Sequence, residues 1–437
     1  MIKTLKHGIT KQIKINSIKN LSNPFSSWHL FYYLVYFQKT NYEFGGFKNY
    51  KFGVFQYLKG LIINNRKNVS QKIIELNRPV EIEKNDTKNK FDFQLKESVS
   101  INMRVITLFP STYGRLVTET KSPLLLNLIE SAKAAGIYLY DYRSDIISDY
   151  AKFHDIEQIK KEWIEISKII SAQNISTLII LGHKNSFSDI NGIELLNLKQ
   201  QYNLTTLVYL TDNWNITYQN LIKNWSVYAD YIISYDYQIF KELPEHLRNK
   251  IIVWSNGPVP IESKVYINSS EKFTIYIGGT CYLNRWAWSC LISQWHKIYR
   301  AKINLNFDFN LQPIVSNSRT HRSIAEYRES YTNKNLATVH FLERHPGIFS
   351  LVGSVFEGFA RGALVIVQTN KEDDPLSKFF IPGKDYLVFS NLEELISILE
   401  MLEEFPENGS LIAWSGFEKY KKTYEPVKVW EQLASNL

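Results

Sequence analysis

Short apolar segments alternate with longer segments of helical spacing along most of this 437-residue chain, and this alternation constrains the fold more than any other feature. TLIILG (177–182) and ALVIVQ (363–368) are apolar almost throughout, which is typical of strands in a parallel sheet with both faces covered. The pattern predicts strands at 104–109, 137–142, 177–182, 205–212, 231–236, 251–257, 273–279, 302–309, 336–341, 363–368 and 386–389. It predicts helices at 122–136, 156–172, 192–201, 218–229, 285–299, 323–331, 355–361 and 392–404, and a last helical segment from Ser410 onward.

Two α/β domains of this kind are predicted, because the chain is too long for one ordinary core. GPVPIES (257–263) contains two prolines and reads as a hinge between alternating regions at 102–258 and 264–415. Open sheets of this class bind ligands outside the carboxyl ends of their strands, so we expect the site in the cleft between the domains. The predicted units are an extension and linker at 1–99, a first Rossmann-like domain at 100–262, a second at 263–415 and a helical segment at 416–437.

Positive charge is concentrated in residues 1–67, which hold eleven Lys or Arg and one acidic residue, Glu43. The whole chain has a net charge of +8, so the remaining residues are together nearly neutral. Fourteen aromatic residues fall within 25–58. Basic residues among aromatic rings suit an anionic membrane interface, and the same rings would also suit a small helical cap packed on the main body. We expect no nucleic-acid partner.

The location of the protein is predicted from the same region and from the cysteines. The apolar run Leu30–Phe37 is shorter than the roughly 20 residues that cross a bilayer, and no small-residue cleavage site follows it. The two cysteines, Cys281 and Cys290, have no second pair beside them, which favours free buried thiols over a zinc site. We therefore expect a cytoplasmic protein, held at the cytoplasmic face of a membrane where the basic extension meets lipid.

The stretch SVFEGFARGALVIVQ (354–368) places one acidic residue, Glu357, beside an apolar strand. Ser354 is a candidate N-cap of a two-turn helix, and Gly362 is a candidate for the left-handed residue that ends it. A helix amino terminus suits a phosphate, because its first amides are unpaired and carry about half a positive charge. Glu357 would lie about 5–6 Å from that terminus. This spacing predicts that its carboxylate accepts hydrogen bonds from the ribose hydroxyls of a nucleotide.

FEGFARGALVIV (356–367), followed by FIPGKDYLVFSNLEELISILEML (380–402), resembles the donor-binding half of the GT-B glycosyltransferases. The resemblance is strongest to the group 1 retaining enzymes and, within them, to the spore-maturation (CgeB-like) type. These enzymes carry Glu-x-x-x-x-Gly before a buried strand, then Pro-Gly-Lys, another strand and a helix that opens with two acids, as this chain does. The resemblance implies a GT-B fold, in which two Rossmann-like, doubly wound parallel-sheet domains face each other. It is weaker over the rest of 273–425, and it concerns layout alone over 102–258.

The resemblance also implies roles for residues of the second domain. Glu357 would hold the ribose of the donor. The backbone amides of Gly278, Gly279 and Thr280 would approach the diphosphate, and Arg285 would neutralise its charge. A simple tight turn is the structural alternative for the glycines, and a solvated helix face is the alternative for Arg285.

Two positions depart from the family pattern. Phe349 stands where many retaining relatives carry a second glutamate, and Val355 stands where spore-maturation relatives carry an arginine. Ser354 and Val355 are still counted as donor-binding, because they open the helix expected to face the phosphates. Arg344 and His345 offer positive charge nearby, so Arg344 is counted with them, although an ordinary exposed loop would also explain both residues.

Two side chains of the first domain follow predicted strands and are candidates on the acceptor side. Family relatives often carry an acid at the position of Asp212, where a carboxylate would bind acceptor hydroxyls or stabilise positive charge on the sugar ring. Two interpretations stay open for each residue. His183 would be either a polar contact in the cleft or a solvated loop residue, and Asp212 either a site residue or part of a turn. Together with Arg285 they form the predicted catalytic set, and PSTYGR (110–115) is the predicted acceptor-side loop.

These features predict a glycosyltransferase that moves a sugar from a nucleotide-diphosphate donor to a glycan, lipid or protein acceptor. Retention of anomeric configuration is implied by the resemblance alone, and we expect neither a metal ion nor a cofactor. The alternative is a non-catalytic nucleotide-sugar-binding module that acts through its basic extension, which the loss of a glutamate at Phe349 favours. An NAD-dependent oxidoreductase is disfavoured, because Gly-x-Gly-x-x-Gly follows neither domain's first strand.

Overall fold

The computed structural model describes residues 102–110, 123–144, 146, 155–182, 187–210, 216–234, 245–254, 259–261, 272–278, 288–289, 292–293, 295–297, 301–307, 335–345, 348–369 and 374–437. The predicted extension and linker at 1–99 and the predicted helix at 323–331 lie outside these residues. Within the described part of the chain, no helix combines the length and the apolar character needed to span a membrane.

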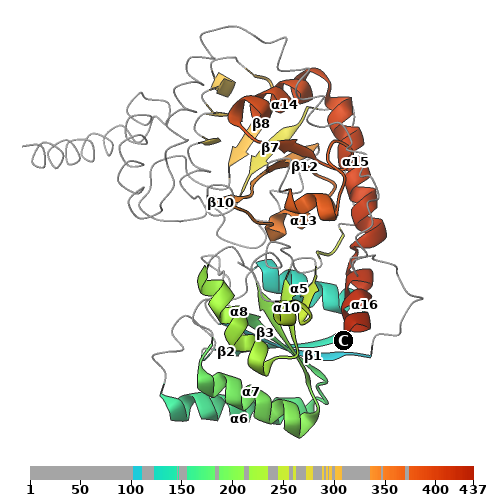
Figure 1. The fold of residues 1–437 in the computed structure, drawn as a ribbon. Coiled ribbons are helices and arrows are strands. Elements are labelled where there is room, and N and C mark those ends of the chain that lie inside the picture. The colour runs from blue at the N-terminus through green and yellow to red at the C-terminus, as the bar shows by residue number, and fades with distance from the viewer. Residues whose placement is uncertain are drawn as a thin grey trace, which may run out of the picture.

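The first domain is a parallel sheet with helices on both of its faces (Figure 1). The strand order is β2-β1-β3-β4-β5-β6, and every neighbouring pair is parallel. The strands are β1 (Arg104–Pro110), β2 (Tyr138–Ser144), β3 (Thr177–Gly182), β4 (Thr205–Leu210), β5 (Tyr231–Ser234) and β6 (Ile251–Val253). The helices are α5 (Pro123–Ala134), α6 (Ile156–Ala172), α7 (Asp189–Tyr202), α8 (Ile216–Tyr228) and α10 (Glu245–Arg248).

Successive residues of the central strands face opposite sides of this sheet, because the side-chain period of a strand is two. On β3, Ile179 and Leu181 pack in the core cluster that includes residues of α5. Leu178 and Ile180 pack in a second cluster with residues of α6, α7 and α8. Both faces of the sheet are therefore buried, which explains why the strand sequences are apolar without interruption.

The second domain repeats this plan with the parallel order β13-β12-β9-β7-β8. Its elements are β7 (Thr274–Ile277), β8 (Asn304–Phe307), β9 (Leu336–Phe341), β10 (Glu343–His345), β11 (Ile348–Phe349), α13 (Gly353–Ala360), β12 (Leu364–Gln368), a 3-10 helix (Pro375–Lys378), β13 (Leu387–Phe389) and α14 (Leu392–Glu404). In both sheets, the first strand lies between the second and the third. The predicted fold class, two Rossmann-like α/β domains each built on a parallel sheet, is confirmed.

Two further helices lead from the second domain back to the first (Figure 1). α15 (Pro406–Thr423) packs against α13 and β12, and α16 (Pro426–Asn436) packs against α5. Trp430 of α16 donates from its indole nitrogen to Ser131 Oγ at 3.0 Å, and its ring meets that of Trp254 edge-on at 5.1 Å. The predicted boundary between 415 and 416 falls inside α15.

Most of the predicted elements match the structure closely. α6, β3 and α14 begin and end at the predicted residues. Gly136, predicted to end α5, has a φ of 71° in the left-handed region. The strand predicted at 205–212 ends at Leu210. The antiparallel pair β10–β11 was not predicted, because strands of three and two residues are too short to show a pattern.

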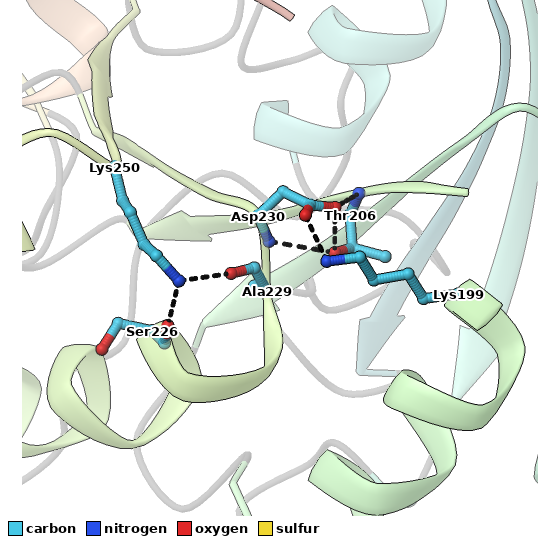
Figure 2. Close-up of polar contacts among 6 residues, drawn as sticks. All are labelled: Lys199, Thr206, Ser226, Ala229, Asp230 and Lys250. Carbon is cyan, nitrogen blue, oxygen red and sulfur yellow. Dashed lines mark hydrogen bonds and ion pairs between the residues drawn. The ribbon is translucent and has the colours of Figure 1, made fainter. Parts of the chain in front are cut away.

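A polar cluster lies at the end of the first sheet where the inner strands β4 and β5 begin (Figure 2). The Asp230 carboxylate accepts hydrogen bonds from the Thr206 backbone nitrogen and Oγ1, both at 2.9 Å, and from Lys199 Nζ. Lys250 donates to the carbonyl oxygens of Ser226 and Ala229, where α8 ends. This end of the sheet is opposite the carboxyl ends of the strands, where open sheets of this class bind ligands, and the hydrogen bonds of the cluster join α7, β4, α8 and the starts of β5 and β6.

Asp230→Asn is expected to lower stability at neutral pH and to have less effect in acid. Burial tends to raise the pKa of Asp230, but the hydrogen bonds from Lys199 and Thr206 and the Lys199 charge outweigh it and lower the pKa. A lowered pKa stabilises the fold above the ordinary aspartate pKa of about 3.9, and this stabilisation is lost as the pH falls through the folded-state pKa. Unfolding midpoints of both proteins from pH 7.5 to pH 3 measure this. The midpoint difference between wild type and Asp230→Asn should shrink below pH 4, whereas that for the exposed control Glu418→Gln should stay constant. A constant difference for Asp230→Asn would refute the prediction.

Candidate functional site

α13 begins at Gly353, and its N-cap position is held by Val352, which makes no side-chain capping hydrogen bond. The prediction that Ser354 is the N-cap is therefore wrong by two residues. The Ser354 side chain bonds elsewhere, so it does not cap the helix. The other end is as predicted: Gly362 has a φ of 70°, which a residue with a Cβ adopts only under strain.

The Ser354 hydroxyl lies 3.2 Å from Nδ1 of His340, a buried histidine at the carboxyl end of β9. Nε2 of the same ring lies 3.0 Å from Thr338 Oγ1. α13 comes close to this strand because Gly358 has no side chain: a Cβ there would lie 2.9 Å from Thr338 Oγ1 and from Val365 Cγ2. The histidine therefore orients the Ser354 hydroxyl near the amino end of α13.

Val355, predicted to bind the donor, is placed in the protein core. Its side chain is fully buried in the cluster that also holds Phe359 and Val365. Its backbone N–H donates to the Val352 carbonyl oxygen at 3.0 Å. Neither group can therefore contact a donor directly, and the prediction that Val355 binds the donor is corrected on this ground.

Glu357 lies on α13 at the contact between the two domains. Its Oε1 accepts a hydrogen bond from Nδ2 of Asn127 at 2.7 Å, and Asn127 belongs to α5 of the first domain. Each of the two residues is only 5% exposed. The carboxylate is thus at the domain boundary, where it faces a side chain of the other domain that the sequence did not indicate.

Tyr420 of α15 lies in the same buried region and fixes the segment between the domains. Its hydroxyl accepts from the Val259 backbone nitrogen at 3.0 Å and donates to the Val259 carbonyl oxygen at 2.8 Å. Burial raises the pKa of Tyr420 well above its usual range, and the nearby Glu357 carboxylate adds to the rise, while the Val259 hydrogen bond and Arg361 oppose it. The predicted hinge at 257–263 is therefore anchored to α15 at Val259.

The Pro-Gly-Lys motif at 382–384 forms a turn next to α15. Gly383 has a φ of 74° and donates from its backbone nitrogen to the Tyr386 carbonyl oxygen at 2.8 Å. The buried Asp385 carboxylate accepts from the Ile381 backbone nitrogen at 2.9 Å and from Ser415 Oγ at 2.7 Å. Within the described residues, the motif therefore ties β13 to α15.

Gly278, at the carboxyl end of β7, is the described member of the predicted phosphate loop. β7 and β9 are neighbours at the point where the strand order reverses, which is where open sheets of this class bind ligands. A Cβ on Gly278 would lie 2.6 Å from the Tyr276 ring. The backbone of Arg344 lies in β10, and Phe349, in place of a second glutamate, is buried.

The remaining predicted site residues stay predictions, because they lie outside the described residues: His183, Asp212, Gly279, Thr280, Arg285 and the side chain of Arg344. Three site neighbours were missed: Asn127, His340 and Tyr420. The only signal for Asn127 was a polar residue inside the apolar run PLLLNLIE (123–130), and His340 was likewise a polar residue in LATVHF (336–341). Tyr420 had no signal, because its contact with Val259 is made across 161 positions.

Comparison with known proteins finds one family for the second half of the chain. Residues 267–435 match the family described as glycosyl transferase-like. No curated protein sequence matches the chain. Among solved structures, TarM has a TM-score of 0.39 and 11% identity, over 60% of this chain and 54% of the TarM chain. SnogD, a glycosyltransferase from Streptomyces nogalater, has a TM-score of 0.41 and 12% identity, over 76% of this chain and 99% of its own.

The matched span holds α13 with Glu357, Gly278 of the predicted phosphate loop and the two helices that return to the first domain. The chain spans about half the length of TarM. Its second domain, together with α15 and α16, is similar to the glycosyl transferase-like family.

Proposed function

We propose that this chain is a glycosyltransferase that binds a nucleotide-diphosphate sugar on its second domain and transfers the sugar to an acceptor bound by its first domain. The observation that carries the proposal is the position of Glu357. It lies on α13 within the span that matches the glycosyl transferase-like family, and its carboxylate contacts the first domain. A donor whose ribose meets this carboxylate would lie where the two domains meet.

The amino end of α13 is the proposed phosphate site. No side chain caps this helix, so no capping side chain takes up the amides of Gly353 and Ser354, whereas the Val355 amide bonds to the Val352 carbonyl oxygen. The Ser354 hydroxyl, held by His340, would contribute a hydrogen bond to a phosphate oxygen. Glu357 lies one turn further along α13 and would accept hydrogen bonds from the ribose hydroxyls.

Transfer breaks the bond between the anomeric carbon and the diphosphate, forms a new bond to an acceptor hydroxyl oxygen and moves the hydroxyl proton to the departing diphosphate. Negative charge develops on the departing diphosphate, and groups already aimed at that charge lower the barrier. We assign this role to Arg285, to the amides of Gly278, Gly279 and Thr280 and to the amino end of α13. His183 and Asp212 would contact the acceptor and the sugar ring. We propose retention of configuration, no metal requirement and a glycan, lipid or protein acceptor.

For the region outside the described residues, we propose that the basic, aromatic segment 1–67 holds a cytoplasmic enzyme against an anionic membrane surface. The charge surplus and the fourteen aromatic residues at 25–58 are the support for this proposal.

A panel of nucleoside diphosphates and their sugar conjugates tests the function through the unfolding midpoint. A ligand at one hundred times its Kd stabilises the folded state by about 2.7 kcal/mol, so one nucleotide base should raise the midpoint clearly above the others. Sugar-nucleotide hydrolysis then separates an enzyme from a binding module: the enzyme is faster than its Arg285→Ala variant, whereas a module shows equal background rates. If no nucleotide in the panel shifts the midpoint, the proposed function is wrong.

A further inference from the structure

The hydrogen bond between Asn127 and Glu357 makes the proposed ribose-binding carboxylate part of the contact between the domains. It joins residues separated by 230 positions, and both side chains are almost completely buried. A hydrogen bond to a carboxylate in such a setting is short, strong and directional. The first domain therefore holds one oxygen of the group that would bind the donor.

α5 is fixed in place on either side of Asn127. Leu126 packs against a cluster of the second domain made of Tyr276, Leu336 and Ala363. Ser131, one turn further along α5, accepts a hydrogen bond from Trp430 of α16 at 3.0 Å. α5 is therefore held by the second domain beside Asn127 and by α16 one turn further along.

We propose that Asn127 is a positioning residue that orients Glu357 for the ribose of the donor and so couples nucleotide binding to docking of the first domain on the second. The same carboxylate would accept hydrogen bonds from the ribose hydroxyls, because a carboxylate accepts up to about four hydrogen bonds. Loss of the Asn127 amide removes the contact with the first domain that orients this carboxylate, and affinity falls although no nucleotide-binding group has been removed. This inference rests on the proposed function.

Asn127→Asp gives the sharpest test, because it replaces the donor with a second carboxyl group. Two carboxylates at this separation cannot both ionise easily, so one of them takes up a proton as the pH falls. At pH 8 the introduced group repels Glu357, whereas at pH 5.5 its protonated form donates a hydrogen bond as Asn127 does. With the nucleoside diphosphate that stabilises the wild type most, affinity should be at least about tenfold below wild type at pH 8 and within about threefold at pH 5.5.

Two variants serve as controls in the same titrations. Asn127→Leu removes the donor at every pH and should weaken binding equally at pH 8 and pH 5.5. Ser131→Ala removes the hydrogen bond from Trp430 on the same buried helix without touching Glu357. It should lower the unfolding midpoint but keep the wild-type affinity at both pH values.

The outcomes separate the inference from the proposed function. If the wild type binds a nucleoside diphosphate and Asn127→Asp binds it equally well at both pH values, the inference is wrong and the proposed function stands. The inference also fails if Ser131→Ala shows the same loss and recovery, because the effect is then one of domain stability. A wild type that binds no nucleoside diphosphate overturns the proposed function, and the inference fails with it.

Discussion

Glu357→Gln is expected to lower the affinity for a nucleoside diphosphate at least about tenfold. Hydrogen bonds to charged groups contribute roughly 1.5–3 kcal/mol, and each 1.4 kcal/mol corresponds to about a factor of ten in Kd. Glutamine has the same size as glutamate and keeps an oxygen that can accept from Asn127, so the contact between the domains is retained. Glu357→Ala should have a larger effect, because the Asn127 amide also loses this acceptor.

Titration calorimetry with wild type and both variants measures this effect. Glu394→Gln is the matched control: Glu394 is buried in the same domain, on α14, and accepts hydrogen bonds from the Ser390 nitrogen at 2.7 Å and the Ser390 hydroxyl at 2.8 Å. This variant should be less stable than wild type but bind the nucleotide with the same affinity. If Glu357→Gln binds as tightly as wild type, the carboxylate does not hold the ribose.

Trp430→Ala is expected to cause the largest loss of stability. Trp430 is fully buried, packs edge-on against Trp254 and donates a hydrogen bond to Ser131. Truncating a buried tryptophan to alanine costs about 3–5 kcal/mol, which is a large part of the roughly 5–15 kcal/mol that keeps a domain folded. Because Trp254 and Ser131 belong to the first domain, the loss should appear there although the mutation lies in α16.

Thermal unfolding, followed by tryptophan fluorescence, measures this loss of stability. We expect the unfolding midpoint of Trp430→Ala to fall by roughly 10 °C. Trp414 provides the control, because it lies on α15 with its side chain 51% exposed. Trp414→Ala should shift the midpoint by only a few degrees, as surface substitutions do. Equal shifts in the two variants would show that α16 does not hold the first domain.

The fold could be predicted largely from the sequence, because strands buried on both faces are apolar throughout and their helices end at recognisable residues. α6 and α14 were placed to the residue, and Gly362 was correctly assigned to the left-handed region. The return of α15 and α16 to the first domain was not predicted. Trp430 and Tyr420 have the spacing of the apolar face of an ordinary amphipathic helix. This spacing does not indicate which domain the helix packs against.

The site was predicted only in part, for a related reason. Local pattern placed Glu357 on a short helix before a buried strand, and the structure puts it at the domain boundary. Local pattern misplaced the N-cap at Ser354, because the hydroxyl is used by His340, a partner 14 positions away. Asn127 lies 230 positions from Glu357, and a contact at that separation leaves no periodic signal in a single sequence.

A crystal structure of the chain with the nucleoside diphosphate that stabilises it most tests the central claim, that α13 holds the nucleotide of the donor. We expect the ribose hydroxyl oxygens at about 2.5–3.0 Å from the Glu357 carboxylate, with the diphosphate at the amino end of α13. A nucleotide bound elsewhere on the chain, with Glu357 bonded only to protein groups, would contradict the claim.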